Sequence, residues 1–161
     1  MIICTTSSVE QTQAVAAHVA SLCADGDLLV LVGDLGAGKT HFTKGFAAAL
    51  GVTEPVTSPT FTLANRYVGD MVVNHVDAYR VEQLDEAEDL ALPEMLDDGV
   101  TLIEWGDLIL PALPKDLLEV RITLGVGDDD RRLELRAVGD AWLDRFDELA
   151  ARLDEWMEPP C

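Results

Sequence analysis

Leu28-Leu29-Val30-Leu31-Val32-Gly33-Asp34-Leu35-Gly36-Ala37-Gly38-Lys39-Thr40 is the segment from which the architecture of this 161-residue chain can be inferred. Its first five residues are apolar and partly β-branched, as in a strand buried on both faces of a parallel sheet. The next eight match G-x-x-x-x-G-K-[ST], the phosphate-binding P-loop. Residues 40–50, rich in Ala and followed by Gly51, predict a helix that ends at a glycine. Strand, glycine loop and helix in this order predict a nucleotide-binding α/β domain.

The residue types of the loop indicate its chemistry. Glycines let successive backbone N–H groups converge on a phosphate without obstruction by Cβ atoms, and the helix N-terminus adds positive potential. The Lys39 ammonium is expected to reach the β- and γ-phosphates, and the Thr40 hydroxyl is expected to ligate Mg²⁺. The sequence contains no guanine-reading N-K-x-D motif, and this absence favours adenine over guanine.

Composition predicts one globular domain over residues 1–161. Hydrophobic residues make up 48% of the chain and charged residues 25%, which is an ordinary balance for a soluble fold with a substantial core. The aliphatic run 28–32 is too short to span a bilayer, and the N-terminal residues lack the basic and apolar regions of a secretory signal. We therefore expect a cytoplasmic protein. The three cysteines form no C-x-x-C pair, which argues against a disulfide framework or a zinc site.

The charge of the chain restricts its partners. Thirty acidic residues against eleven basic ones give a net charge of −19. Such a surface repels a nucleic-acid backbone, so direct tight binding of nucleic acid is not expected. Any role in nucleic-acid metabolism would then run through a partner protein.

The remaining hydrophobic pattern predicts a mixed sheet flanked by helices, and thus a P-loop NTPase-like α/β domain. Strands are expected at 2–5, 60–68, 71–76, 100–104, 117–124 and 132–137, with the second and third forming a hairpin. A first helix is expected after the Ser7-x-x-Glu10 capping-box spacing, and an acidic one over 81–92. A last helix is expected after an Asp140 cap, with Leu143 facing the core.

Hydrolysis needs an acid near Mg²⁺ and a group that orients water. Asp77 and Glu104 each end an apolar strand, where a carboxylate is costly unless it is paired or metal-bound; the polarity of turns would also account for either acid. His75 lies two residues before Asp77 on the same strand face, so the two form either a water-orienting or a structural pair. The segment 58–60 is either a γ-phosphate-sensing switch or an ordinary strand-entry turn.

Four motifs in this order closely resemble the TsaE (YjeE) family. They are the P-loop at 33–40, Ser58-Pro59-Thr60-Phe61-Thr62-Leu63, His75-Val76-Asp77-Ala78-Tyr79-Arg80 and Ile103-Glu104-Trp105. The resemblance implies a small P-loop ATPase that works with TsaD and TsaB in the bacterial synthesis of N6-threonylcarbamoyladenosine at position 37 of tRNA. In the family, TsaE does not make the modification itself, and its ATP hydrolysis supports repeated turnover of the TsaD–TsaB pair.

The resemblance also implies roles for individual residues. The expected contacts to ATP or ADP come from Asp34, Gly36, Ala37, Gly38, Lys39, Thr40, His41 and Arg131. Thr40 and Glu104 would hold Mg²⁺, while the catalytic set would be Lys39, Asp77 and Glu104. The segment 58–60 would be the switch, and Trp105 would pack either beside the nucleotide or in the core. His41 stands where the family usually has another threonine, a departure that could alter nucleotide affinity.

Two other functions fit the same motifs. A small-molecule kinase needs additional Arg or Lys residues to hold its acceptor, and few are available near the loop. A nucleotide-gated interaction module would bind ATP without depending on its hydrolysis. The carboxylates of 82–89 are either a solvated face or a docking surface, and the sequence does not rank these two.

Overall fold

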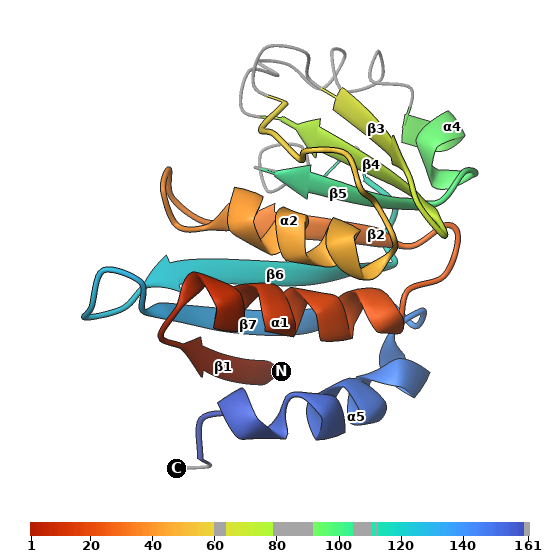
Figure 1. Ribbon diagram of the computed structural model, residues 1–161. Helices are drawn as coiled ribbons and strands as arrows, with labels where there is room; N and C mark the ends of the chain where they lie inside the picture. The colour runs from red at the N-terminus through yellow and green to blue at the C-terminus, as the bar shows by residue number, and fades with distance from the viewer. Residues whose placement is uncertain (60–63, 79–91, 105–110, 112, 160–161) are drawn as a thin grey trace.

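The computed structural model describes residues 1–59, 64–78, 92–104, 111 and 113–159. In this part of the chain, seven strands form one mixed sheet in the order β1-β7-β6-β2-β5-β4-β3 (Figure 1). The strands are β1 (Ile2–Thr6), β2 (Leu28–Val32), β3 (Ala64–Val68), β4 (Val72–Asp77), β5 (Val100–Glu104), β6 (Leu117–Leu124) and β7 (Arg131–Val138). The helices are α1 (Val9–Ser21), α2 (Lys39–Ala49), α4 (Leu92–Leu96) and α5 (Leu143–Arg152), with a 3₁₀ turn, η2, at Asp154–Trp156. The predicted α/β fold with a mixed sheet flanked by helices is confirmed.

The centre of the sheet is parallel. β2 pairs in parallel with β5 on one side and with β6 on the other, and β4 continues the parallel part beyond β5. All five residues of β2 are buried, because the strand is covered on both faces. Leu29 and Leu31 pack into the core beneath α1 and α2, whereas Leu28, Val30 and Val32 pack into a second core on the opposite face. This two-sided burial explains the uninterrupted apolar run.

The two long N-terminal helices lie side by side over one face of the sheet (Figure 1). Phe42 and Phe46 of α2 are fully buried in the core between this helix and the strands. Gly45 faces α1 so closely that a Cβ atom there would lie 2.5 Å from the Cα atom of Gln13. The glycine therefore sets the distance between α1 and α2, and with it the position of the P-loop helix over β2.

The N-cap of α1 differs from the sequence-based expectation. Ser8, not Ser7, is the N-cap of α1, and its hydroxyl accepts from Gln11 N; Gln11 Oε1 in turn accepts from Ser7 N. The N-cap therefore lies one residue later than the Ser7-x-x-Glu10 spacing predicts, and Gln11 bonds the residue before the cap.

The Asp140 cap predicted for the last helix is wrong. α5 follows Trp142, and the Asp140 N–H instead donates to the Asp116 carboxylate. Leu143, predicted to face the core, is 56% exposed.

An ion pair fixes α5 to the turn before β2. Arg145 donates to both carboxylate oxygens of Asp27, at 2.6 and 3.0 Å, and its guanidinium lies 4.1 Å from the ring centre of the buried Trp142. The Asp27 carboxylate raises the pKa of Arg145 through this hydrogen bond, although burial opposes the shift. Sequence periodicity gave no sign of this contact, because it joins residues 118 positions apart.

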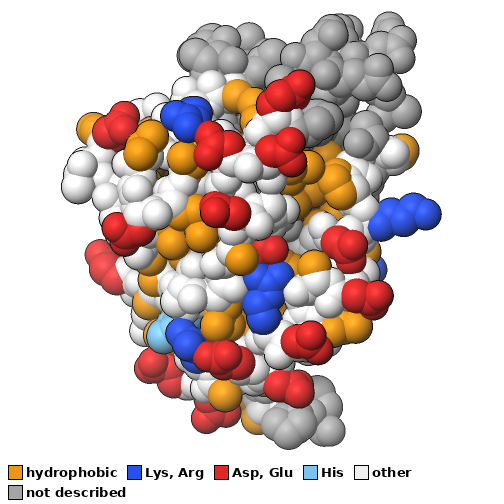
Figure 2. All heavy atoms as spheres, turned by 90° about the vertical axis from the view of Figure 1, so that its right-hand side faces the viewer, with side chains coloured by type: hydrophobic (Ala, Val, Ile, Leu, Met, Phe, Trp, Pro, Cys, Tyr) orange, Lys and Arg blue, Asp and Glu red, His pale blue; other side chains and the backbone are white. Residues whose placement is uncertain are grey.

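Several predicted features lie outside the described residues. These are the start of the hairpin at 60–63, the acidic stretch 81–91, Thr60 of the predicted switch, and Trp105. Figure 2 shows the side of the molecule opposite the P-loop, where Asp and Glu side chains are spread among apolar ones rather than gathered in one patch. No helix among residues 1–59, 64–78, 92–104 and 113–159 has the length and apolar character needed to cross a membrane.

Candidate nucleotide-binding site

The P-loop connects the end of β2 to the start of α2. Gly38 is the N-cap of α2 with φ of 111°, a left-handed conformation that favours glycine. The Lys39 ammonium folds back across the loop and donates to the carbonyls of Gly33, at 2.6 Å, and Asp34, at 3.1 Å. Lys39 is only 6% exposed. The loop is thus a closed turn whose lysine lies over its backbone, and the expected contact of Lys39 with the β- and γ-phosphates stays a prediction.

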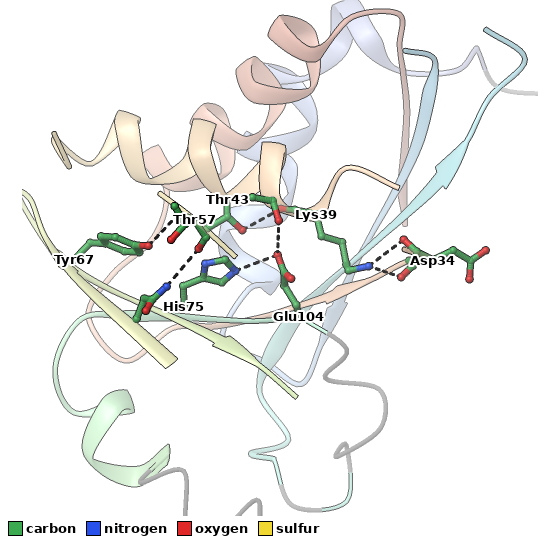
Figure 3. Close-up of polar contacts among 10 residues, drawn as sticks. Asp34, Lys39, Thr43, Thr57, Tyr67, His75 and Glu104 are labelled. Carbon is green, nitrogen blue, oxygen red and sulfur yellow. Dashed lines mark hydrogen bonds and ion pairs between the residues drawn. The ribbon is translucent and has the colours of Figure 1, made fainter. Parts of the chain in front are cut away.

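A cavity of about 640 Å³ opens at the P-loop. Its lining comes from separate parts of the chain, and consists of Leu35, Gly36, Gly38, Lys39, Thr40, His41, Ser58, Asp77, Glu104 and Arg131. Two other residues from the predicted nucleotide set do not line it. Ala37 is buried, and Asp34 is exposed with its carboxylate pointing away from Lys39 in Figure 3. The fold therefore gathers most of the predicted site residues around one cavity.

Thr40 and His75 both contact the same carboxylate oxygen. The Thr40 hydroxyl donates to Glu104 Oε1 at 3.4 Å. His75 Nε2 lies 3.1 Å from the same atom, and Figure 3 shows the His75 ring facing Glu104. His75 is fully buried, and Glu104 is 3% exposed. The hydrogen-bonded neighbour of His75 is thus Glu104 on the next strand, a contact that the shared strand face of His75 and Asp77 did not reveal.

Asp77 and Glu104 end neighbouring strands at the same edge of the sheet. They are register partners in the parallel pair of β4 and β5, and both line the cavity. Among the residues described, no three His, Cys, Asp or Glu side chains form a cluster able to hold a metal by themselves. Mg²⁺ bound with a nucleotide needs only one or two carboxylates besides phosphate oxygens and water. The hydroxyl of Thr40 and these carboxylates are oxygen donors that fit such an ion.

Arg131, the first residue of β7, also borders the cavity. Its Nε donates to the Ala37 carbonyl at 2.6 Å, and its Nη1 donates to the carbonyls of Asp128 and Asp130, both at 2.8 Å. The side chain therefore ties the P-loop to the turn between β6 and β7. Arg131 therefore lies beside the P-loop and binds its backbone, and its expected contact with the nucleotide stays a prediction.

The segment after α2 is anchored just before Ser58. Thr57 N donates to the Tyr67 hydroxyl at 3.3 Å, and Asn65 Nδ2 donates to the Thr57 carbonyl at 3.4 Å. Figure 3 shows the Tyr67 hydroxyl facing Thr57, alongside His75 and Glu104. Two strand residues thus hold the segment at the point where Ser58 enters the cavity lining.

Comparison with known proteins agrees with this geometry. The family model described as "Threonylcarbamoyl adenosine biosynthesis protein TsaE" matches residues 6–133. The tRNA threonylcarbamoyladenosine biosynthesis protein TsaE of Bacillus subtilis is 47% identical over 139 residues, which cover 85% of this chain and 86% of that protein. The protein of the same name from Streptomyces coelicolor is 44% identical over 132 residues, covering 78% and 89% of the two chains.

The same likeness extends to three dimensions. A crystal structure of Bacillus subtilis YdiB superposes with a TM-score of 0.74 at 38% sequence identity, covering 96% of this chain and 97% of that one. The matched family model spans all the described residues that line the cavity. The chain therefore belongs to the TsaE family of tRNA threonylcarbamoyladenosine biosynthesis proteins.

Proposed function

We propose that this chain binds ATP with Mg²⁺ and hydrolyses it, and that hydrolysis supports a TsaD–TsaB pair in forming N6-threonylcarbamoyladenosine at position 37 of tRNA. One observation carries the proposal: the Thr40 hydroxyl lies 3.4 Å from Glu104 Oε1 in the cavity that the P-loop and Lys39 also line. A P-loop hydroxyl next to a strand-end carboxylate is the pair that holds Mg²⁺ in P-loop NTPases.

Each part of the cavity would have a distinct role. Backbone N–H groups of 36–40 would bind the phosphates, and the Lys39 ammonium would neutralise charge on the β- and γ-phosphates. Thr40 and Glu104 would hold Mg²⁺, which stabilises charge on the transferring phosphate when it is bound. Asp77, at the same sheet edge as Glu104, would orient the attacking water. Ser58 would sense the γ-phosphate from the anchored segment after α2.

The charge of the chain supports a protein partner. A net charge of −19 opposes contact with the tRNA backbone, so the chain would act on TsaD–TsaB rather than on tRNA. The matching relatives are named for tRNA threonylcarbamoyladenosine biosynthesis, which is the pathway this partnership would serve. A role in tRNA modification would place the protein in the cytoplasm.

Release of inorganic phosphate from ATP tests the proposal, measured on the chain alone and with TsaD and TsaB added. We expect slow hydrolysis by the isolated chain and a higher rate with the partners, because the partner would complete the switch. Lys39→Ala with the same partners serves as the control for contaminating ATPase. An unchanged rate on addition of TsaD–TsaB contradicts the proposed partnership. A phosphorylated small molecule in place of free phosphate would favour the kinase alternative.

A further inference from the structure

We propose that His75 is a positioning residue, whose Nε2–H group orients the Glu104 carboxylate toward Mg²⁺. The inference rests on the proposed function, since it concerns the same metal site. His75 does not itself line the cavity, but its ring contacts the carboxylate of Glu104, which does.

The hydrogen bond directs Nε2 of His75 at Glu104. A carboxylate oxygen accepts, so Nε2 carries the hydrogen that lies between the ring and Glu104 Oε1. Nδ1 has no hydrogen-bond partner among the described residues. The ring is fully buried. Burying an unpartnered nitrogen costs free energy, and an apolar side chain would fill this place without that cost. Packing alone therefore does not account for a histidine, whereas the Nε2 contact does.

Two donors from different elements converge on one oxygen of Glu104. His75 approaches from β4 and Thr40 approaches from α2, and both contact Oε1. Glu104 Oε2 takes part in none of the hydrogen bonds described, and the residue lines the cavity. Holding Oε1 from two sides fixes the rotation of the carboxylate, which leaves Oε2 for a cation. A hydrogen-bond partner that orients a metal-binding carboxylate is worth about 10–100-fold in metal affinity in known sites.

The register of the sheet explains why β4 supplies this residue. Asp77 lies directly opposite Glu104, and His75 lies directly opposite Leu102, two residues before Glu104. The side chains of alternate residues share a face, so His75 reaches diagonally to Glu104 while Asp77 takes the neighbouring place at the cavity. The motif H-x-D thus places one carboxylate in the cavity and one donor behind the carboxylate of the next strand.

Two substitutions distinguish the loss of a hydrogen-bond donor at the Nε2 position from the loss of the imidazole ring itself. A glutamine amide nitrogen can reach the place of Nε2, whereas an asparagine side chain extends only as far as Nδ1. We would measure ADP binding by calorimetry in EDTA and across a Mg²⁺ titration, for the parent, His75→Gln and His75→Asn. His18→Asn is the matched control, because His18 lies on α1 beside Trp156 and outside the cavity.

We expect ADP binding in EDTA to match the parent in all variants. In His75→Asn, the Mg²⁺ concentration at which ADP binding is enhanced half-maximally should rise about tenfold or more. In His75→Gln and His18→Asn, this concentration should stay close to that of the parent. In a Glu104→Gln background, His75→Asn should cause no further shift, because the effect runs through Glu104. Should His75→Asn fail to fold in thermal unfolding, His75→Leu takes its place.

Three results would overturn the inference. One is a parental Mg²⁺ titration in His75→Asn, and another is an equal shift in His75→Gln and His75→Asn. The third is weaker ADP binding in EDTA to the same extent as in Mg²⁺, which is the signature of general damage to the site. Failure of the proposed function gives a different result: if ADP binding by the parent does not depend on Mg²⁺, the proposed metal site itself is wrong.

Discussion

Asp77 and Glu104 are register partners on the parallel strands β4 and β5, so two carboxylates stand side by side at one edge of the sheet. Carboxyl ends of parallel strands meet at the same edge, where ligands bind in open α/β sheets. The two acids differ in their surroundings, because Glu104 contacts the Thr40 hydroxyl and the His75 ring. Under the proposed function, this difference favours Glu104 as the metal ligand and Asp77 as the residue that orients the attacking water.

Glu104→Gln and Asp77→Asn should therefore fail in different ways. Glu104→Gln should weaken the Mg²⁺ dependence of nucleotide binding and lower ATP hydrolysis about 100-fold or more, because charge stabilisation at the transition state is lost. Asp77→Asn should lower hydrolysis while leaving the Mg²⁺ titration near that of the parent. Phosphate release and Mg²⁺-dependent ADP calorimetry on both variants check this. The reverse pattern, with Asp77→Asn shifting the Mg²⁺ titration and Glu104→Gln leaving it unchanged, would exchange the two roles.

The tie between Arg131 and the P-loop should contribute to nucleotide affinity. Arg131→Ala removes the hydrogen bond to the Ala37 carbonyl and those to the turn at 128–130. A charge-assisted hydrogen bond is worth about 1.5 kcal/mol or more, so ADP affinity should fall about tenfold. Arg131→Lys keeps one hydrogen-bond donor and should lose less ADP affinity than Arg131→Ala. Equal ADP affinity in the parent and Arg131→Ala would show that the loop keeps its shape without this contact.

Gly45→Ala should destabilise the fold, although alanine is the better helix former. Helix propensity alone favours alanine by about 1 kcal/mol. A Cβ atom at position 45 would lie 2.5 Å from the Cα of Gln13, so α1 and α2 must move apart, and we expect a net loss of about 1–3 kcal/mol in unfolding free energy. Urea unfolding measures it, with Ala48→Gly on the exposed side of α2 as the control for propensity. An increase in stability would show that the helices can separate without cost.

The buried thiols should make stability fall at high pH. Burial, with a smaller contribution from the Glu158 charge, raises the pKa of Cys4 from 9.0 to about 11. Burial and the Asp27 charge also raise the pKa of Cys23, while Arg145 opposes the shift. Both thiols stay protonated in the folded state at a pH where they ionise in the unfolded chain. Their stabilisation is therefore complete below about pH 9; for Cys4 it is lost as the pH rises toward 11, and for Cys23 the loss continues to higher pH.

Cys4→Ala should flatten this loss of unfolding free energy between pH 9 and pH 11, measured by urea unfolding in a Cys161→Ser background. An unchanged pH slope in Cys4→Ala would show that the Cys4 thiol does not carry the effect. Native-state thiol modification at pH 8 should also be slow at Cys4 compared with the denatured chain.

The central strand, its loop and the following helix were predictable because each depends on local sequence. The apolar run at 28–32 reflects burial on two faces, and Gly38 supplies a backbone conformation that other residues rarely adopt. Contacts between distant segments were not predictable from spacing. The His75–Glu104 contact depends on β4 lying next to β5, and the Arg131–Ala37 contact depends on a turn 94 residues away.

Local sequence patterns did not identify the correct N-caps of α1 and α5. Ser7 and Ser8 both precede α1, and only the geometry of the chain entering the helix selects Ser8 as the cap. Asp140 has the side chain of a good cap, but the Asp116 carboxylate takes its backbone N–H and the helix starts after the buried Trp142. The sequence could not show this, because Asp116 is 24 residues away.

Calorimetric titration of ADP into the parent, Lys39→Ala and Lys44→Ala at millimolar Mg²⁺ addresses the proposed nucleotide site directly. Lys39 folds over the P-loop, whereas Lys44 is exposed on the same helix and lines no part of the cavity. We predict saturable binding by the parent and by Lys44→Ala, and at least a tenfold weaker affinity in Lys39→Ala, since a charge-assisted contact to phosphate is lost. No detectable binding by the parent, or the same affinity in Lys39→Ala, would contradict the proposal that this loop binds nucleotide.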